Sequence, residues 1–366
     1  MRSPLPTLPG RDRYYLLDGL RGFAAIAVGL LHYRWTLMPG GYLAVDLFFM
    51  LSGFVLARSY QDALTSGLAA AAFLRKRLVR LYPLYLAGTL GGALLAARQF
   101  RHSIDPAALQ DFVMGLGFNL AMLPNPSAPV LFPFNPASWS LFYELFANAV
   151  LALVLVRLSR RRLVLACLVF GAALVTAAVI MSHSAAGRAV YSSHVGVVAM
   201  GVEWQDWPLA LLRTLFSFTV GVSLATLHTR DARKLTNWAA LPIAVMIGCF
   251  LVQIAFSARI GFDLVFVMLV APLLLVAGIR LQPGPRLAAI CAVLGELSYA
   301  FYALHLPILQ LFKQLAERTG LSEIPLAPLY LATVLGLSWL ATRYYDVPLR
   351  RWLTGRLEGK KEFART

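Results

Sequence analysis

Charge and cysteine are both scarce in this sequence. Only 14% of its 366 residues are charged and 59% are hydrophobic, whereas soluble domains carry about 25% charged residues. Its three cysteines (Cys167, Cys249 and Cys291) all fall inside apolar runs, so no disulfide framework is implied. Acidic residues number 17 against 33 Lys and Arg, but no separate basic domain accompanies them. An ordinary soluble domain is therefore excluded, and we expect no nucleic acid partner.

The sequence instead contains apolar runs of roughly 18 to 22 residues, the length that crosses a hydrocarbon core of about 30 Å. We predict an all-α, polytopic transmembrane helix bundle in the lipid bilayer. We place about ten spans, at residues 15–35, 40–58, 81–97, 138–156, 163–181, 208–228, 236–256, 261–279, 287–311 and 327–343. The first run lacks a small-residue cleavage site, so we interpret it as a retained helix rather than a signal peptide.

The distribution of Lys and Arg predicts the orientation. If the apolar segment 109–123 is interfacial or re-entrant, 24 of the 33 Lys and Arg lie on one side of the membrane and seven on the other. Cytoplasmic loops carry such an excess, so we predict that both termini are cytoplasmic. The long outer segments 98–137 and 182–206 are interpreted as lids or binding loops, or as plain connections. We expect one membrane domain over residues 1–366, without a fused soluble domain.

The first span carries ionisable residues, which are costly inside a bilayer and usually face the bundle interior. Asp18 and Arg21 are three residues apart, close enough on a helix to pair. His32 follows Arg21 by 11 residues, which returns it to within roughly 20° of the same helix face after a rise of about 16 Å. We therefore predict one inward stripe, with the Asp–Arg pair in its cytoplasmic half and the histidine in its outer half.

Other spans place charged residues at about the depth of His32. Asp46, Glu144 and Arg213 each enter from the predicted outer side. A histidine with a carboxylate partner is a standard general base, and Glu144 is the predicted partner. The alternative is that these residues form ion pairs that hold helices together. His305 is interpreted as structural or as a wall of an acceptor cavity.

Six motifs occur in order along the chain: LDGLRGFAAIAVGLLHY, GGYLAVDLFFMLSGFVLAR, FLRKRLVRLYPLYL, SWSLFYELFANAV, LGELSYAFYALHLPIL and TRYYDVPLRRW. Together they resemble the acyltransferase 3 family of integral membrane acyltransferases. The sequence departs from the family pattern at Ala44, where glycine is common, and at Ala147 and Asn148, which replace an aromatic pair. Asp346 stands where the family usually has Glu.

This resemblance implies transfer of an acyl group, usually acetyl, from cytoplasmic acyl-CoA to a hydroxyl of a cell-surface carbohydrate or another acceptor. It makes His32 the catalytic base with Glu144 beside it, and it places Arg21, near Asp18, in the donor site. Arg75, Arg77 and Arg80 are candidates for the phosphates of acyl-CoA, although the positive-inside rule alone would explain them. The predicted substrate-binding residues are Asp46, Trp139, Ser140, Arg213 and His305.

Two alternatives to surface O-acetylation stay open. One is a proton-coupled transporter or flippase, which also carries charged residues at mid-membrane. The other, within the family, is acylation of a small molecule such as a macrolide. No metal is expected, because the sequence has neither an HExxH motif nor a cysteine cluster. We expect a protein of the bacterial plasma (inner) membrane, with homo-oligomerisation left open.

Overall fold

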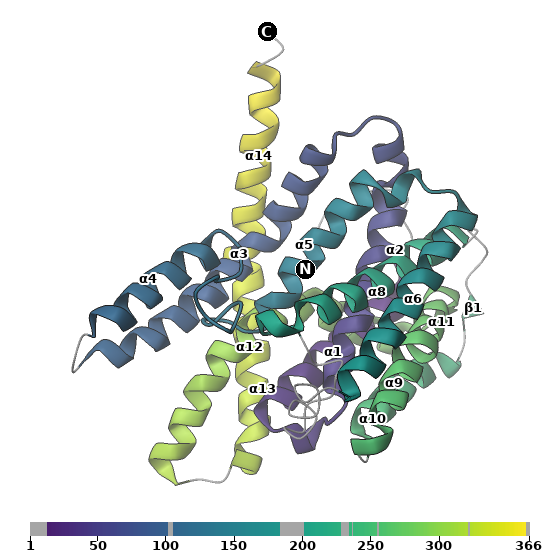
Figure 1. Ribbon diagram of the computed structural model, residues 1–366. Coiled ribbons are helices and arrows are strands. Elements are labelled where there is room, and N and C mark those ends of the chain that lie inside the picture. Colours follow the sequence, from purple (N-terminus) through teal and green to yellow (C-terminus); the bar gives the residue numbers. More distant parts are fainter. Residues whose placement is uncertain are drawn as a thin grey trace.

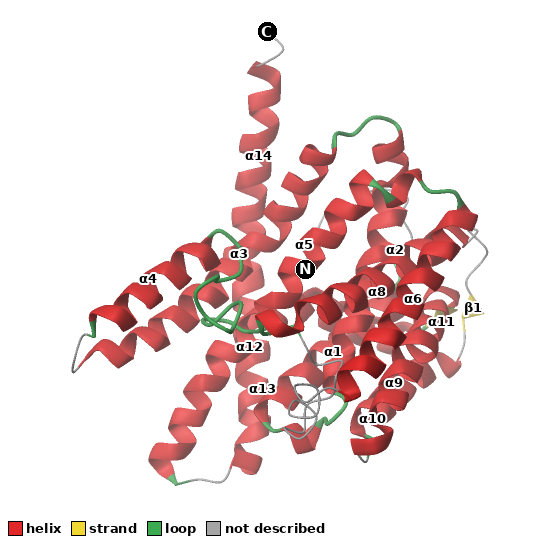
Figure 2. Ribbon diagram, viewed as in Figure 1, coloured by secondary structure: helices red, strands yellow, loops and turns green. Residues whose placement is uncertain are grey.

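The computed structural model describes residues 13–101, 105–183, 201–227, 234–235, 237–254, 256–320 and 323–363. These residues form a bundle of helices (Figure 1), and Figure 2 shows how little of the chain outside them is loop. The predicted all-α fold is confirmed. The helices are α1 (Tyr15–Tyr33), α2 (Ala44–Thr65), α3 (Ala70–Ala96), α4 (Pro106–Leu120), α5 (Ser138–Leu153), α6 (Arg160–His183), α8 (Trp207–Leu227), α9 (Leu241–Leu251), α10 (Phe256–Val265), α11 (Ala271–Arg280), α12 (Pro285–Thr319), α13 (Glu323–Leu340) and α14 (Val347–Phe363).

Short elements connect these helices. Two π-helical turns, η8 (Phe266–Val270) and η9 (Ala341–Asp346), join α10 to α11 and α13 to α14 without a break. The 3-10 turns are η1 (Trp35–Leu37), η2 (Gly41–Leu43), η3 (Ala97–Arg101), η4 (Leu155–Arg157), η6 (Trp204–Asp206) and η7 (Asn237–Ala240). Two strands of two residues each, β1 (Lys234–Leu235) and β2 (Leu281–Gln282), pair in parallel.

Nine helical segments of the described chain are long and apolar enough to cross a membrane. They are Tyr15–Tyr33, Gly41–Thr65, Ala70–Ala96, Ser138–Arg157, Arg160–His183, Trp204–Leu227, Ala258–Arg280, Pro285–Thr319 and Ile324–Arg356. The predicted span 236–256 is the exception, because its helix, Asn237–Leu251, ends before the extended residue Val252. The segment 109–123, predicted not to be a span, lies mainly in α4, whose 15 residues are not among the nine.

The pairing of β1 with β2 explains how the short α9 fits the predicted threading. Lys234 lies opposite Leu281, and Leu235 opposite Gln282. The chain between them contains α9, α10 and α11, so it leaves one end of the bundle and returns to the same end. The short α9 therefore leads away from that end and α10–α11 leads back to it, although α9 is not among the nine described helices long enough to cross a membrane. The cytoplasmic position of the termini stays a prediction.

Close contact between helices depends on glycines. A Cβ atom on Gly22 of α1 would lie 2.4 Å from Leu294 Cβ of α12. A Cβ atom on Gly53 of α2 would lie 2.2 Å from the Phe218 carbonyl oxygen of α8, and one on Gly221 of α8 would lie 2.0 Å from the Met50 carbonyl oxygen. Two helix pairs, α1 with α12 and α2 with α8, thus approach backbone to backbone.

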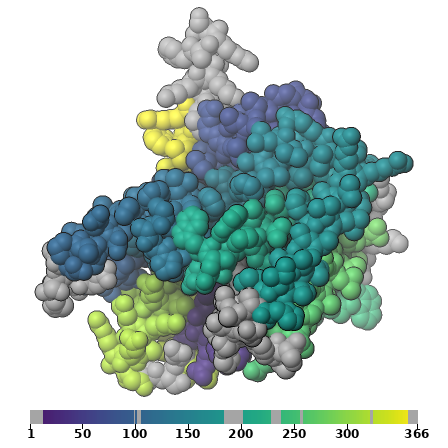
Figure 3. Space-filling view, in the orientation of Figure 1, coloured from purple at the N-terminus to yellow at the C-terminus, as the bar shows by residue number. Residues whose placement is uncertain are grey.

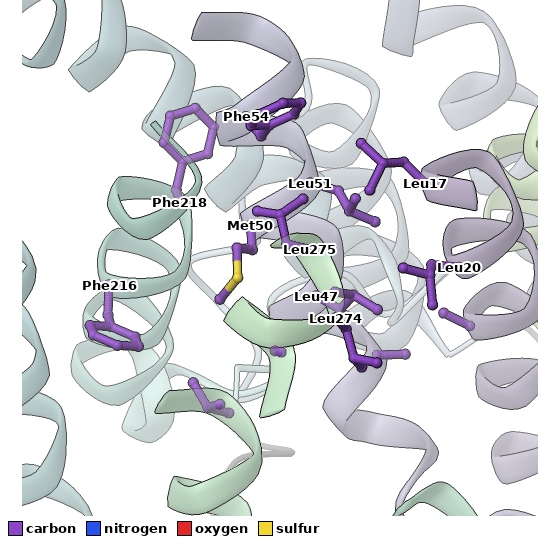
Figure 4. Close-up of a cluster of buried hydrophobic side chains, with 14 of the residues drawn as sticks. Leu17, Leu20, Leu47, Met50, Leu51, Phe54, Phe216, Phe218, Leu274 and Leu275 are labelled. Carbon is purple, nitrogen blue, oxygen red and sulfur yellow. The ribbon is translucent and has the colours of Figure 1, made fainter. Parts of the chain in front are cut away.

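The apolar core lies where these pairs meet α11. Figure 4 shows leucines of α1 and α2 beside Phe218 of α8 and Leu275 of α11. The outer surface is apolar as well. On α6, Leu165, Leu168 and Ile180 are 59%, 66% and 63% exposed. Buried and outward-facing apolar side chains on the same bundle are typical of a protein whose solvent is lipid.

The two long segments that are predicted to lie outside contact each other. The backbone N–H of Leu131 donates to the Val202 carbonyl (2.8 Å), and that of Trp204 donates to the Pro129 carbonyl (3.0 Å). The Trp204 indole also donates to the Asn125 carbonyl at 2.8 Å. Much of the segment predicted as 182–206, residues 184–200, lies outside the described residues. Elsewhere α4 projects from one side of the bundle and α14 from one end (Figures 1 and 3).

Replacing Gly221 with Ala should destabilise the bundle, because its Cβ atom meets backbone that cannot rotate away. We expect a loss of about 1–3 kcal/mol, the usual cost of overpacking, seen as a lower unfolding temperature in detergent. Gly248→Ala is the matched control, because that exposed helical position has nothing within 4 Å. Equal unfolding temperatures of the two variants would contradict the packing described for α2 and α8.

Cysteine labelling tests the orientation. In a background without Cys167, Cys249 and Cys291, Ser127→Cys should react with a membrane-impermeant maleimide on intact cells. Ser66→Cys, between α2 and α3, should react only after permeabilisation. Both serines are exposed, so accessibility does not separate them except by the membrane. The reverse pattern would invert the predicted topology.

Candidate active site

The polar residues of the candidate site lie where α1 contacts α12. On α12, Gly295, Ser298, Tyr302 and His305 are spaced by three or four residues, so they share one helix face. That face meets α1 at two levels. Arg21 occupies one level and His32 the other, separated by a rise of about 16 Å for an ideal helix.

At the first level Arg21 bonds to neutral groups. Its Nε donates to Ser298 Oγ (2.8 Å) and its Nη2 to the Gly295 carbonyl (2.6 Å). The predicted pair between Asp18 and Arg21 is wrong, because Asp18 Oδ2 accepts instead from Arg13 Nε at 2.7 Å. The physical reason is that α12 holds the Arg21 guanidinium, while Arg13 supplies the cation that Asp18 pairs with. Asp18 lies against Gly295, where a Cβ atom would be 2.5 Å from Asp18 Cβ.

At the second level two imidazoles meet. His32 Nδ1 lies 3.1 Å from His305 Nε2, with the ring centroids 5.1 Å apart. His305 Nδ1 lies 2.7 Å from the Tyr302 carbonyl oxygen. The Tyr302 hydroxyl and Ser140 Oγ are 2.7 Å apart, so Ser140 of α5 joins the same cluster. The structure thus brings three predicted site residues together: His32, His305 and Ser140.

The two rings differ in exposure. His305 is 0% exposed, whereas His32 is exposed. A lipid-facing helix would show an exposed stripe along its length, but Val28 and Ala25, one and two turns before His32, are 2% and 1% exposed. The exposure of His32 is therefore local to the C-terminal end of α1. His32 is thus the more exposed residue of a histidine pair whose mutual contact is partly buried.

Glu144 does not contact His32, so the prediction that it pairs with this histidine is wrong. Glu144 Oε1 accepts from Ser52 Oγ (2.8 Å) and from Arg77 Nη2 (3.0 Å). The reason is its position on α5, one turn beyond Ser140, where α3 supplies a cation. The ring partner of His32 is His305 instead.

Arg77 is also contacted by Asn148, one of the departures from the family pattern. With its amide oriented to satisfy both neighbours, the Asn148 oxygen accepts from Arg77 Nε at 3.3 Å and its nitrogen donates to the Glu144 carbonyl at 3.2 Å. The aromatic residue usual at this position in the family could make neither bond. Asn148 therefore helps to hold the Arg77–Glu144 pair.

The other predicted phosphate-binding arginines differ in their surroundings. Arg80 Nη1 lies 3.5 Å from Asp346 Oδ2, an oxygen that also accepts from Arg350 Nη2 at 2.6 Å. The Arg80 guanidinium lies over the Tyr299 ring, 5.4 Å from its centroid. Arg75 is exposed. Of the three arginines, Arg77 and Arg80 thus already have carboxylate partners.

Asp46 and Arg213 form a bidentate ion pair between α2 and α8. Arg213 Nη2 lies 2.5 Å from Asp46 Oδ2 and Arg213 Nε lies 3.1 Å from Oδ1. Both residues are 0% exposed, and the Arg213 guanidinium also lies 5.5 Å from the centroid of the Trp139 ring. Such complete burial favours the alternative in which this pair joins two helices, rather than contact of Asp46 and Arg213 with an acceptor.

Sequence reasoning missed several residues of the site, namely Ser298, Tyr302, Ser52 and Asn148. A signal was available for two of them, since Ser298, Tyr302 and His305 repeat at helical spacing within one motif. In the described parts of the chain, no three residues among His, Cys, Asp and Glu are grouped so that they could hold a metal ion.

Replacing Arg213 with Met should leave the Asp46 carboxylate buried without its counter-charge. Breaking a buried ion pair in this way costs about 3–5 kcal/mol, whereas removing both charges is often neutral. We therefore expect a large drop in unfolding temperature for Arg213→Met in detergent and recovery in Asp46→Leu/Arg213→Met. A single variant as stable as the wild type would contradict a structural role for the pair.

A family model described as an acyltransferase domain matches residues 14–343. Protein 2 in the picA locus of Rhizobium radiobacter is 38% identical over 189 residues, which cover 46% of this chain and 95% of that protein. BcsY of Komagataeibacter xylinus, named as a membrane-bound transacylase, is 28% identical over 83% of this chain and 78% of its own length.

A third relative is the acyltransferase MdmB of Streptomyces mycarofaciens, 27% identical over 80% of this chain and 78% of its own. No solved structure matches. The family match covers almost the whole helix bundle, including both levels of the α1–α12 site. The chain therefore belongs to the acyltransferase 3 family of integral membrane proteins.

Proposed function

We propose that this protein transfers an acyl group, acetyl in the first instance, from cytoplasmic acyl-CoA to a hydroxyl of a cell-surface carbohydrate. One observation carries the proposal: the contact between α1 and α12 holds a guanidinium at one level and a pair of imidazoles at the other. Arg21 lies on the predicted cytoplasmic half of that contact, and His32 on the outer half. A donor that enters from the cytoplasmic side and an acceptor that enters from the outer side would meet between these two levels.

The contacts of Arg21 suit a donor site. Both of its hydrogen-bond partners among the described residues, Ser298 Oγ and the Gly295 carbonyl, are neutral. Arg75 and Lys76 are exposed on α3, which suits contact with the phosphates of a nucleotide. Arg77 and Arg80 would bind phosphate only if the phosphate replaced their carboxylate partners, Glu144 and Asp346.

Polar side chains support a route between the two levels for the pantetheine arm. Ser52, Glu144 and Tyr299 come from three different helices, and each is partly exposed. Glu144 lies one turn from Ser140, which contacts Tyr302 at the histidine level, and it bonds Arg77 near the predicted cytoplasmic end. The arm would pass these groups to bring its thioester to His32.

The reaction needs a base at the histidine level. His32 would take the proton of the acceptor hydroxyl while the hydroxyl oxygen attacks the carbonyl carbon of the thioester. The ester C–O bond forms, the C–S bond breaks, and the proton passes from His32 to the departing thiolate of CoA. An acyl-histidine intermediate is the other course. In that course the acyl group passes first to His32 and then to the hydroxyl.

The printed names of two relatives, a transacylase and an acyltransferase, support acyl transfer. They leave the acceptor open between a surface carbohydrate and a small molecule such as a macrolide. We place the protein in the bacterial inner membrane, where acyl-CoA is available on one side and surface glycans are assembled on the other. A proton-coupled transporter or flippase would release no thiol from acyl-CoA.

Replacing His32 with Ala should reduce acyl transfer about 10²-fold or more, the usual contribution of a general base. Mass spectrometry of surface glycans from cells that carry each variant gives the acyl content. Thiol release from acetyl-CoA by purified protein in detergent gives the donor half of the reaction. Both should fall while the unfolding temperature and membrane yield stay close to those of the wild type.

His183→Ala is the matched control, since His183 is exposed at the end of α6, outside the α1–α12 contact. It should leave acyl transfer unchanged. Unfolding of the His32 variant would favour a structural histidine. Undiminished acyl content with a stable His32 variant would refute the proposed base.

A further inference from the structure

We infer that His305 is a positioning residue for His32: it holds the proton of His32 on Nδ1, so that Nε2 is the atom that does the chemistry. This inference rests on the proposed function for its catalytic meaning. Its structural part, the tautomer of each ring, follows from the hydrogen bonds and can be tested separately.

The first step concerns His305. Its Nδ1 lies 2.7 Å from the Tyr302 carbonyl oxygen, and a carbonyl oxygen only accepts hydrogen bonds, so this nitrogen must carry the hydrogen. The ring is 0% exposed, and no carboxylate of the described chain bonds to it. Burying an imidazolium without a counter-charge is unfavourable. His305 is therefore the neutral tautomer with hydrogen on Nδ1, and its Nε2 is an acceptor.

The second step follows at once for His32. Its Nδ1 lies 3.1 Å from His305 Nε2. Because that nitrogen accepts, His32 Nδ1 must donate. A neutral imidazole carries one N–H, so the lone pair of His32 lies on Nε2. His32 is the more exposed residue of the two, so we assign its unprotonated Nε2 as the basic nitrogen for an acceptor hydroxyl.

The packing around His305 keeps the hydrogen bond between His305 and His32 in place. The Phe301 ring stacks on His305 at 6.2 Å with an interplanar angle of 11°, and the Tyr302 ring lies 5.7 Å away. Gly29 of α1 allows the close approach, because a Cβ atom there would lie 2.6 Å from Phe301 Cε1. The two imidazoles reach hydrogen-bond distance because the helices touch one turn before His32.

The hydrogen bond between the two histidines differs from the carboxylate–histidine pair that the sequence predicts. A carboxylate would both orient the imidazole and balance the positive charge that forms on it. His305 is neutral and does only the first. Glu144, the predicted candidate for the second task, is bonded to Arg77 and Ser52. Among the described residues, His32 therefore receives orientation from His305 and from the Val28 carbonyl, both of them neutral.

Three variants at position 305 distinguish the effect of losing the hydrogen-bond acceptor for His32 from the effect of changing the size of the side chain. In His305→Gln the amide oxygen reaches about as far as Nε2 and can accept from His32, whereas the shorter side chain of His305→Asn does not reach. His305→Leu fills space but accepts nothing. We expect acyl transfer within about tenfold of wild type for Gln and a loss of about 10²-fold or more for Asn and Leu, with surface-glycan acyl content as the readout.

The second readout is ¹⁵N NMR of histidine-labelled full-length protein in detergent, with the His32 signals assigned from His32→Gln. Wild type and His305→Gln should show His32 protonated at Nδ1 and unprotonated at Nε2. His305→Leu should lose that fixed pattern. Thermal unfolding of each variant checks folding, and the similarly sized Gln and Asn variants decide the matter if Leu does not fold.

Each outcome is decisive. A wild-type His32 protonated at Nε2 would overturn the inference even if acyl transfer were normal. Equal transfer by the Gln, Asn and Leu variants would overturn the positioning role. If wild-type protein transferred no acyl group but showed the derived tautomers, the hydrogen-bond relay would stand and the proposed function would fail.

Discussion

The close contact between α1 and α12 is the constraint on which the rest of this structure depends. Gly22 and Gly29 on α1 and Gly295 on α12 each lie so near the other helix that a Cβ atom would come within 3.0 Å of it. In lipid, helices gain no hydrophobic stabilisation by associating with each other, so such contact relies on van der Waals packing and interhelical hydrogen bonds. The same contact brings Arg21 to Ser298 and His32 to His305.

The charged residues of the bundle divide into two groups by their partners. Asp46 with Arg213, Glu144 with Arg77, and Asp346 with Arg80 and Arg350 are joined as ion pairs. They connect α2 to α8, α3 to α5 and α3 to the η9–α14 junction. Removing one partner of a buried ion pair is strongly destabilising, so each pair favours the arrangement in which its two helices meet.

Arg21 and His32 differ from those pairs because their hydrogen-bond partners are neutral. A guanidinium held by a hydroxyl and a carbonyl keeps its charge available to an anionic or polarised group. An imidazole held by another neutral imidazole keeps a lone pair available. At the α1–α12 contact, the difference between these two residues and the ion pairs thus comes from their partners rather than from residue type.

The sequence by itself determined the helical bundle, nearly all of its spans, the family and the line that joins Arg21 to His32. These follow from the length of apolar runs, from helical periodicity along one span and from motifs that are contiguous in the chain. It also anticipated that Asp46 and Arg213 are opposite charges at one depth. Each of these inferences needs only distances measured along the chain or along a single helix.

Only the tertiary structure decided which groups touch. Depth in the membrane places Glu144 and His32 at a similar level but does not say which way each helix is turned, and the structure bonds them to Arg77 and His305. Asp18 likewise bonds Arg13 and not its helical neighbour Arg21. His32 and His305 are 273 residues apart in the chain. Their contact is set by how the faces of two helices meet, which no single-helix pattern records.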